Sequence, residues 1–335
     1  MIRKWPHWMP AKCETVPLVS VVIPTRDRPE ATARAVRSAL QQSHRKLEVI
    51  VIDDGSSAPE QTRQALLSLQ DPRVSIHVQG HNLGANSARN RGVRLSAGEY
   101  VAFLDSDDEW YQEKISRQLA VLYEAGPNTV VYCQARALSL VGTKVVEQII
   151  PLRPIVANET IGDYLFCNRG AMVTPSIVMA RALALAVPFD ESLKRHQDFA
   201  FLLRLEERGC KFVMSHHVLV RVDWRTLAAS GRHLHPEYSR AFLKSFGNRL
   251  SIRARSGFWF RNVVLPFLFA GERRRALWLA VTFPLTAVHL AMQPRELLKT
   301  FIFILFPKSF SHAILKYSGR LKSSDTSPGT RTVER

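Results

Sequence analysis

Strand and helix patterns alternate over the first 125 residues, and this alternation limits the folds open to the chain. Four short apolar runs, rich in β-branched residues, are each followed by a segment with helical periodicity. Strands that alternate with helices form βαβ units, and such apolar strands are typical of a sheet buried on both faces. The sequence predicts an α/β fold with a doubly wound, mainly parallel sheet. We expect its strands at 18–23, 47–52, 74–78 and 100–104, and its helices at 29–42, 59–69, 85–96 and 112–124.

A polar turn follows each of these strands. Asp, Gly and Ser are ordinary turn residues, so one such turn alone would indicate little. In a doubly wound sheet, however, ligands bind outside the carboxyl ends of the strands, where all four turns meet. The sequence therefore predicts a binding site at this edge, built from Thr25-Arg26-Asp27, Asp53-Asp54-Gly55-Ser56, Asn82-Leu83-Gly84 and Asp105-Ser106-Asp107-Asp108.

The rest of the chain is less regular. We expect strands at 130–135, 144–149, 175–179 and 211–214, and a helix at 199–208. A helical pattern begins at Pro236, and the polar end of the chain from Ser318 is expected to be disordered.

Composition excludes several classes of protein. A hydrophobic fraction of 46% with 22% charged residues is not that of a disordered chain. Four cysteines without a C-x-x-C pair favour neither a disulfide scaffold nor a zinc module, and they fit a reducing compartment. The first 17 residues contain no apolar run of signal-peptide length. We therefore expect a cytoplasmic protein.

The net charge of +17 is concentrated in the last third of the chain. Residues 221–335 hold 20 basic and 6 acidic side chains, which is +14 of the total. Such asymmetry favours an anionic partner, either nucleic acid or anionic lipid, although a solvated basic face is the simpler alternative.

The motif Asp105-Ser106-Asp107 carries the sharpest chemical signal. Two carboxylates separated by one residue at a strand end can face a common point. Hard oxygen ligands suit Mg²⁺ or Mn²⁺, which would also take oxygens from a diphosphate. A D-x-D triplet alone is weak, but its place beside Asp53 and Asp54 strengthens the prediction of a divalent metal site.

Four segments, VSVVIPTRDRP, EVIVIDDGSS, HNLGANSARNRGV and GEYVAFLDSDDEW, resemble the successive motifs of family 2 glycosyltransferases with the GT-A fold. The likeness continues through TPSIVMARALA, FDESL and HQDFAFLLRL, and covers residues 17–230. It implies a Rossmann-like GT-A domain, a nucleotide-sugar donor, a divalent metal and transfer with inversion at the anomeric carbon. We accordingly expect an N-terminal extension at 1–16, the GT-A domain at 17–230, a basic, apolar helical region at 231–318 and a disordered tail at 319–335.

The resemblance also implies roles for individual residues on the donor side. Asp54 would accept a hydrogen bond from the base, and Asp53 would support the turn or the ribose. Asp107 would be the closer metal ligand, with Asp105 nearer the sugar or ribose. The expected nucleotide-sugar site comprises Pro24, Thr25, Arg26, Asp53, Asp54, Arg89, Asp105 and Ser106, and the expected metal ligands are Asp107 and Asp105.

On the acceptor side, the resemblance implies that Asp198 is the general base. A carboxylate in the first turn of a helix stays ionised readily and can take a proton from an acceptor hydroxyl, although a helix-capping role is the alternative. Gln197 replaces the family's Glu, and His196 could contact the acceptor or simply lie at the surface. Trp110 could cover the sugar or pack in the core, and Arg225 could contact the diphosphate.

The C-terminal region joins basic clusters to apolar runs. Residues 276–292 form a run of 17, interrupted by Pro284 and His289, which is short for a bilayer span of about 20 residues. Apolar side chains beside Lys and Arg clusters favour a helix in the headgroup region, with a span or packing against protein as alternatives. Such a region would suit a lipid-linked acceptor at the cytoplasmic face of the inner membrane.

The leading interpretation is an inverting glycosyltransferase of bacterial surface polysaccharide or lipopolysaccharide synthesis. A nucleotidyltransferase would need a Gly-rich basic loop after the first strand, where this chain has Pro-Thr-Arg-Asp. A nucleic-acid-binding protein would interleave its basic residues with polar and aromatic ones rather than long aliphatic runs. An inactive scaffold would not need Asp54, Asp105, Asp107 and Asp198.

Overall fold

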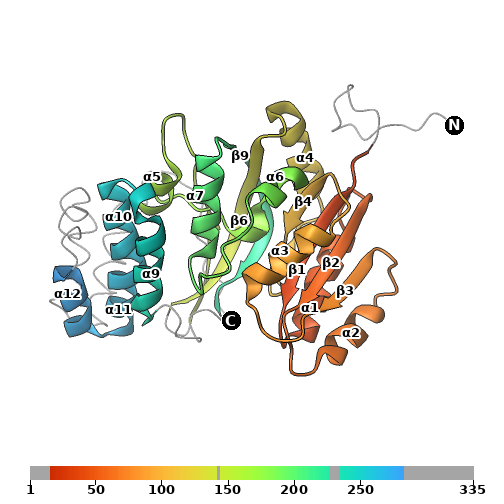
Figure 1. Cartoon of the computed structure of the whole chain (residues 1–335), viewed down its shortest axis with the longest axis horizontal. Helices are drawn as coiled ribbons and strands as arrows, with labels where there is room; N and C mark the ends of the chain where they lie inside the picture. Colours follow the sequence, from red (N-terminus) through yellow and green to blue (C-terminus); the bar gives the residue numbers. More distant parts are fainter. Residues whose placement is uncertain (1–15, 142–143, 226–233, 283–335) are drawn as a thin grey trace.

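The computed structural model describes residues 16–141, 144–225 and 234–282 (Figure 1). In these residues one nine-stranded sheet has the order β3-β2-β1-β4-β8-β6-β9-β5, with β7 paired to β6. The strands are β1 (Val19–Thr25), β2 (Leu47–Asp53), β3 (Val74–Val78), β4 (Tyr100–Phe103), β5 (Glu109–Trp110), β6 (Thr129–Val141), β7 (Lys144–Ile150), β8 (Val178–Ala180) and β9 (Lys211–Asp223).

The predicted α/β class is confirmed. Strands β3, β2, β1 and β4 are parallel neighbours, because a helix connects each strand to the next. The other half is mixed: β6 is parallel to β9, whereas β8, β7 and β5 pair antiparallel. All seven residues of β1 are buried, as expected for a strand in the middle of a covered sheet.

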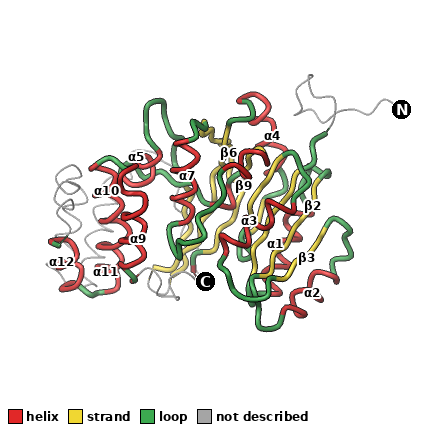
Figure 2. The backbone as a smooth tube through the Cα atoms, in the orientation of Figure 1, coloured by secondary structure: helices red, strands yellow, loops and turns green. Residues whose placement is uncertain are grey.

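Helices cover both faces of the sheet (Figure 2). One core contains side chains from α1 (Pro29–Leu40), α2 (Pro59–Leu67) and α4 (Lys114–Ala125). The core on the other face contains side chains from α3 (Ala85–Leu95), α5 (Ile161–Phe166), α6 (Arg181–Ala186) and α7 (Gln197–Glu207).

The sequence interpretation misses several elements of the second half of the sheet. Strand β9 continues far beyond the expected end at residue 214, and β5, α5 and α6 are not expected at all. The segment 175–179 is only partly a strand, because a 3₁₀ turn at Thr174–Ser176 precedes β8.

Within the described residues, four α-helices follow the sheet along the chain, and the first two of them extend the core of the domain that carries the sheet. They are α9 (Pro236–Phe246), α10 (Ile252–Trp259), α11 (Leu265–Ala270) and α12 (Arg273–Val281). Phe242 and Phe258 are fully buried in the same core as Phe201 of α7. Gly257 allows α10 to approach α5 closely, since a Cβ there would lie 2.5 Å from the carbonyl oxygen of Phe166. The helices α9 and α10 are therefore packed directly on the domain that carries the sheet (Figure 1).

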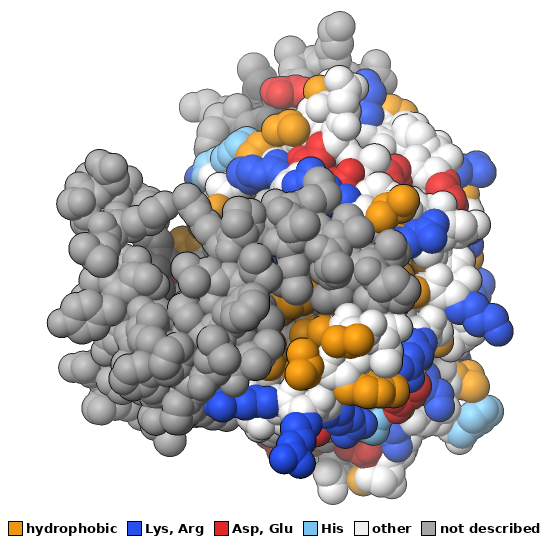
Figure 3. Space-filling model, turned by 90° about the vertical axis from the view of Figure 1, so that its left-hand side faces the viewer, with side chains coloured by type: hydrophobic (Ala, Val, Ile, Leu, Met, Phe, Trp, Pro, Cys, Tyr) orange, Lys and Arg blue, Asp and Glu red, His pale blue; other side chains and the backbone are white. Residues whose placement is uncertain are grey.

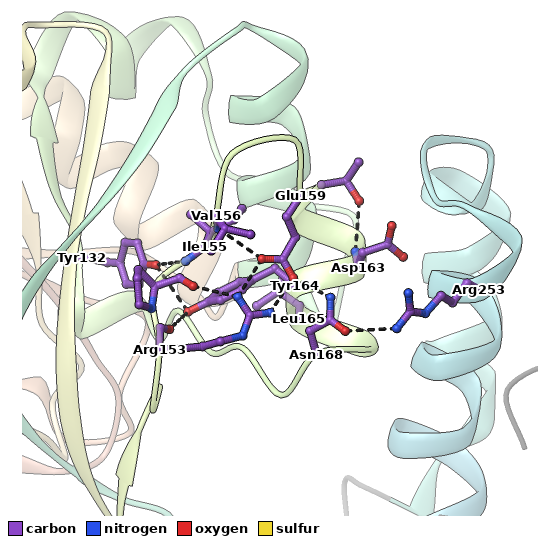
Figure 4. A network of polar contacts seen from close by, with 12 residues as sticks. Tyr132, Arg153, Ile155, Val156, Glu159, Asp163, Tyr164, Leu165, Asn168 and Arg253 are labelled. Atoms are coloured by element: carbon purple, nitrogen blue, oxygen red, sulfur yellow. Dashed lines mark hydrogen bonds and ion pairs between the residues drawn. The ribbon is translucent and has the colours of Figure 1, made fainter. Parts of the chain in front are cut away.

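Polar contacts also connect these helices to the domain (Figure 4). Glu159 accepts from the guanidinium of Arg153 at 2.5 Å and from the Asn168 amide at 2.5 Å. Asn168 in turn accepts from Arg253 of α10 at 3.1 Å. The hydroxyl of Tyr164 in α5 donates to the carbonyl oxygen of Arg153, and the guanidinium of Arg153 lies over the Tyr164 ring. The loop before α5, the loop after it and α10 thus form one network.

Within the described residues, which end at 282, we find no helix with both the length and the apolar character needed to cross a bilayer. The predicted run 276–292 lies only partly in this range, and the expected N-terminal extension and tail lie outside the described residues.

Candidate active site

A large cavity opens at the carboxyl ends of β1, β2 and β4, where the four polar turns were expected to meet. Its volume is about 1180 Å³. The second half of the chain contributes its opposite wall, from the segment before α7, the end of β9 and one residue of α9. Ten of the predicted site residues line it: Pro24, Thr25, Arg26, Asp54, Arg89, Asp105, Ser106, Asp107, Gln197 and Asp198.

The paired acids after β2 have different surroundings. Asp54 faces the cavity and accepts from the Gln79 amide at 2.7 Å and from the backbone N–H groups of Leu83 and Gly84, both at 2.8 Å. Its carboxylate is therefore fixed in orientation against the loop before α3. Asp53 is fully buried away from the cavity, and one of its oxygens accepts from the backbone N–H of Ser56 at 2.8 Å. Asp53 thus supports the turn, as one of its two expected roles required.

Close backbone packing positions these loops. Gly55 has a φ of 69°, and a Cβ at this position would lie 2.5 Å from the backbone carbon of His81. Asp27 accepts from the backbone N–H of Ser57 at 2.7 Å and thereby joins the loop after β1 to the loop after β2. Backbone packing and hydrogen bonds consequently hold the loops after β1, β2 and β3 together at this side of the cavity.

Each carboxylate of the D-x-D motif is paired with an arginine. Arg89 donates to Asp105 at 2.5 Å, and Arg28 donates to Asp107 at 2.5 Å. Burial and the neighbouring Asp105 raise the pKa of Asp107, and Arg28 opposes this shift. Asp108 is buried and accepts from the backbone N–H of Asp223 at 3.0 Å. Burial, with Asp105 and Asp107 nearby, raises the pKa of Asp108 well above its ordinary value.

Asp198 lies in the first turn of α7, half-buried in the cavity wall. Its carboxylate accepts from the backbone N–H of Phe199 at 2.9 Å. Burial raises the pKa of Asp198, and the charge of Asp105 adds to this effect, whereas Arg89 lowers the pKa. Asp198 thus has the position and the raised proton affinity suited to a general base.

Four predicted residues lie elsewhere. His196 is buried against the rings of Phe199 and Phe258, with its Nε2 2.9 Å from the Ser239 hydroxyl, so the surface interpretation is wrong. Trp110 packs in the core and donates to the carbonyl oxygen of Pro175. Of the two interpretations of Trp110, the structure therefore supports core packing.

Arg225 is exposed and paired with Asp223 at 2.5 Å, just outside the cavity lining. Its neighbour Trp224 lines the cavity instead. Asp53, as described above, is the fourth predicted residue that does not line the cavity.

The sequence analysis misses several residues of the cavity wall. Arg28 is an ordinary arginine at a helix start, and only its contact with Asp107 identifies it. Tyr238 of α9 lines the cavity although it lies in the region expected to form a separate basic extension. No local pattern could indicate these two residues, because their neighbours in the site are distant in sequence.

We find no set of three or more His, Cys, Asp or Glu arranged to hold a metal ion in the part of the chain that the structure describes. A Mg²⁺ or Mn²⁺ that binds with a nucleotide needs only one or two carboxylates, because phosphate oxygens and waters complete its coordination. The D-x-D carboxylates line the cavity, and the charge of Asp105 adds to the burial that raises the pKa of Asp107. The residues present therefore fit a divalent cation that arrives with a diphosphate.

Comparisons with known proteins identify the family and the fold of the chain. The family described as "Glycosyl transferase family 2" matches residues 20–183. The chain is 31% identical over 201 residues to the amylovoran biosynthesis glycosyltransferase AmsB of Erwinia amylovora. The matched residues cover 58% of this chain and 66% of AmsB. It is 30% identical over 208 residues to an Escherichia coli protein, the UDP-Glc:alpha-D-GlcNAc-diphosphoundecaprenol beta-1,3-glucosyltransferase WfgD, covering 60% of this chain and 77% of WfgD.

The chain spans just under two thirds of AmsB and of the putative colanic acid glycosyl transferase WcaA of E. coli, with 66% of each covered. Among solved structures, S. aureus TarS 1–349 superposes with a TM-score of 0.55 at 19% identity, over 86% of this chain and 80% of that one. At 19% identity, the likeness to TarS concerns the fold alone. Together with the identity to WfgD, the match to the family shows that the chain belongs to glycosyltransferase family 2 and has its GT-A fold.

Proposed function

We propose that this protein transfers a sugar from a nucleoside-diphosphate sugar to an acceptor hydroxyl, with inversion at the anomeric carbon. The observation that carries the proposal is the single cavity that Asp54, the D-x-D carboxylates and Asp198 share. Donor-side and acceptor-side groups of a displacement reaction thus surround one space. A nucleotidyltransferase would have no use for a base placed opposite the D-x-D motif.

In this mechanism Asp54 orients the nucleotide base, and Asp198 takes the proton of the acceptor hydroxyl. The acceptor oxygen then forms a bond to the anomeric carbon while the bond from that carbon to the diphosphate oxygen breaks. Arginine side chains at the cavity donate to the diphosphate as it gains charge. Asp105 and Asp107 would hold a bound Mg²⁺ or Mn²⁺, whose charge stabilises the leaving diphosphate.

The acceptor is proposed to be a glycan carried on a polyprenyl diphosphate. WfgD is named for a GlcNAc-diphosphoundecaprenol acceptor, and AmsB for amylovoran biosynthesis. In this chain the half-buried Tyr238 and Trp224 and the exposed Lys194 also line the cavity. Aromatic rings and a cation suit a sugar that is followed by a phosphate. The product would belong to a bacterial surface polysaccharide.

The test is a thermal-shift panel with UDP, GDP, dTDP and CMP, each with and without Mn²⁺. At about 100 times its dissociation constant a ligand adds about 2.7 kcal/mol, which raises the Tm by a few degrees. We expect one nucleotide to raise the Tm in the presence of Mn²⁺, and Asp54→Ala to abolish the shift. The matched control Asp71→Ala removes a carboxylate paired with Arg73 outside the cavity and should keep the shift. A folded wild type that responds to no nucleotide would disprove the donor site.

We further propose that the C-terminal helices contact the anionic, cytoplasmic face of the membrane. Large apolar side chains are exposed on α10 and α12, among them Trp278 at 58% and Val281 at 73%. Basic residues accompany them, and Figure 3 shows Lys and Arg beside apolar side chains on the face that includes α12. Apolar side chains rimmed by positive charge suit an anionic headgroup region.

Co-sedimentation with vesicles tests this contact. We expect binding to phosphatidylcholine vesicles that contain phosphatidylglycerol, with little binding to phosphatidylcholine alone and a loss at high salt. Trp278→Ser with Val281→Ser should weaken binding. The control Leu67→Ser changes an equally exposed leucine of α2 and should not. Equal binding by the double variant and the wild type would contradict the contact.

A further inference from the structure

Arg28 forms an ion pair with Asp107, the carboxylate that the proposed metal ion would need as a ligand. It follows β1 and precedes α1, and its Nη1 lies 2.5 Å from Oδ2 of Asp107. We propose that Arg28 is an exchangeable counter-cation: it neutralises Asp107 in the free enzyme, leaves when a divalent cation binds there, and then donates to the diphosphate of the donor. This inference rests on the proposed function, because it concerns the same donor site.

The two arginines at the D-x-D motif differ in their freedom to move. Arg89 has a side chain only 6% exposed, lies over the Phe189 ring and is 3.5 Å from the Asn86 side chain. Arg28 has a side chain 47% exposed, and its guanidinium forms an ion pair with Asp107 at the cavity. Arg89 is thus a fixed part of the wall, whereas Arg28 can leave at little cost.

The backbone of Arg28 is fixed although its guanidinium is not. Its carbonyl oxygen accepts from the backbone N–H of Thr32 at 2.9 Å and from the Thr32 hydroxyl at 2.6 Å. The hydroxyl of Thr32 also lies 2.6 Å from that of Thr25 in β1. The side chain can therefore change rotamer while the loop keeps its conformation, and it remains over the cavity that it lines.

Electrostatic repulsion prevents Arg28 and a divalent cation from binding Asp107 at the same time. A guanidinium and a divalent cation on the same carboxylate of Asp107 would repel each other at short range. Arg28 therefore opposes metal binding as long as no diphosphate is present. Once a diphosphate is bound, the released guanidinium finds acceptor oxygens suited to its planar fork, so it favours the complex. The exchange would couple metal affinity to donor binding.

Titration calorimetry with Mn²⁺ tests the exchange on the whole 335-residue chain without any activity assay. With Mn²⁺ alone, we expect Arg28→Gln to bind about fivefold more tightly than wild type, the size expected for loss of a half-exposed ion pair. With Mn²⁺ and inorganic diphosphate together, we expect the order to reverse, because the variant lacks a diphosphate donor. Arg28→Lys keeps the charge and should resemble wild type with Mn²⁺ alone.

The matched control is Arg63→Gln, which removes a similarly exposed arginine of α2 that pairs with Glu60 at 3.3 Å, outside the cavity. It should leave the affinity for Mn²⁺ alone unchanged. Equal Mn²⁺ affinity of wild type and Arg28→Gln would overturn the exchange and leave the metal site standing. If neither protein binds Mn²⁺ with or without diphosphate, the metal site itself fails and the exchange fails with it. An unchanged melting temperature would show that Arg28→Gln is folded.

Discussion

Arg89 and Asp105 form an ion pair of 2.5 Å in which the arginine side chain is 6% exposed and the carboxylate 29% exposed. The charge of Arg89 also lowers the pKa of Asp198, so this buried cation acts on both the D-x-D motif and the proposed general base. Its removal leaves carboxylates facing one another without compensation.

We therefore expect Arg89→Met to lower the free energy of unfolding by about 2 kcal/mol, below the range for fully buried pairs because Asp105 is partly solvated. It should also abolish nucleotide binding. Urea denaturation measures the first effect. Arg91→Met, on the same helix, removes a guanidinium that donates to the Val78 carbonyl oxygen outside the cavity, and it should keep nucleotide binding. Nucleotide binding by a folded Arg89→Met variant would refute the predicted role of Arg89 in the nucleotide site.

Asp198→Asn should lower kcat by about 10²- to 10⁴-fold, the contribution usual for a general base. Donor binding should persist, since Asp198 lies on the acceptor side. A variant that loses donor binding and turnover together would indicate a structural role instead.

The pH dependence of kcat follows from the same carboxylate. Burial raises the pKa of Asp198 above its ordinary value of 3.8, and only the ionised form accepts a proton. The rate should therefore fall on acidification at a pH above the usual range of aspartate. Rates at saturating donor and acceptor between pH 4.5 and 8 would reveal this limb. A rate independent of pH down to 4.5 would contradict Asp198 as the base.

Lys114 is a fully buried amine over the ring of Trp110, 4.1 Å from its centre, with no hydrogen-bond partner among the described residues. Burial lowers its pKa from 10.5 to about 7. Above pH 7 the unfolded chain therefore binds more protons at this residue than the folded one, so the free energy of unfolding contributed by Lys114 rises with pH. Below pH 7 both states are charged and the full cost of burial remains.

Lys114→Met should consequently stabilise the protein at pH 7 by about 1–3 kcal/mol, after the loss of the cation–π contact is subtracted. The gain over wild type should shrink between pH 7 and about 8, a window below the ordinary cysteine pKa of about 8.5. Urea denaturation across this window checks it. Lys244→Met, at an exposed position of α9, should show no such trend. A destabilised Lys114→Met would mean that the amine has a stabilising contact.

Gly257→Ala tests the packing of α10 on α5. The added methyl group would lie 2.5 Å from the carbonyl oxygen of Phe166, and backbone cannot give way cheaply. We expect a loss of about 1–3 kcal/mol, the usual cost of overpacking. Gly247→Ala provides the control, since the nearest atoms to its Cβ are 3.9 Å away. Equal stability of the two variants would contradict the close approach.

Local pattern predicts the first half of the fold and the donor side of the site. Strands β1 to β4 are apolar runs whose turns reach one edge, so Asp54, Asp105 and Asp107 could be placed together without a structure. The prediction fails where pairing is non-local. Strand β9 continues through the polar Ser215-His216-His217, which breaks the apolar pattern, because its pairing with β6 resumes at Val218 after a shift of register at the two histidines.

The residues whose positions the sequence does not predict have one physical property in common. His196 has a φ of 63° and turns its ring into an aromatic core formed partly by α9 and α10, a region expected to be separate. Tyr238 enters the cavity from the same helices. Arg28 is defined only by Asp107, which lies 79 residues away. These positions depend on tertiary contacts and have no signature in their neighbours.

The hydrogen bond from the backbone of Asp223 to Asp108 joins residues 115 positions apart. A ribosome that has released the chain only as far as β8 has already supplied the whole D-x-D motif, yet Asp108 still lacks this donor and β5 lacks its neighbour β9. The donor pocket therefore reaches its final form late in synthesis, together with the acceptor wall. In a nascent chain, the D-x-D end of the cavity would be completed only together with the wall that contains Asp223.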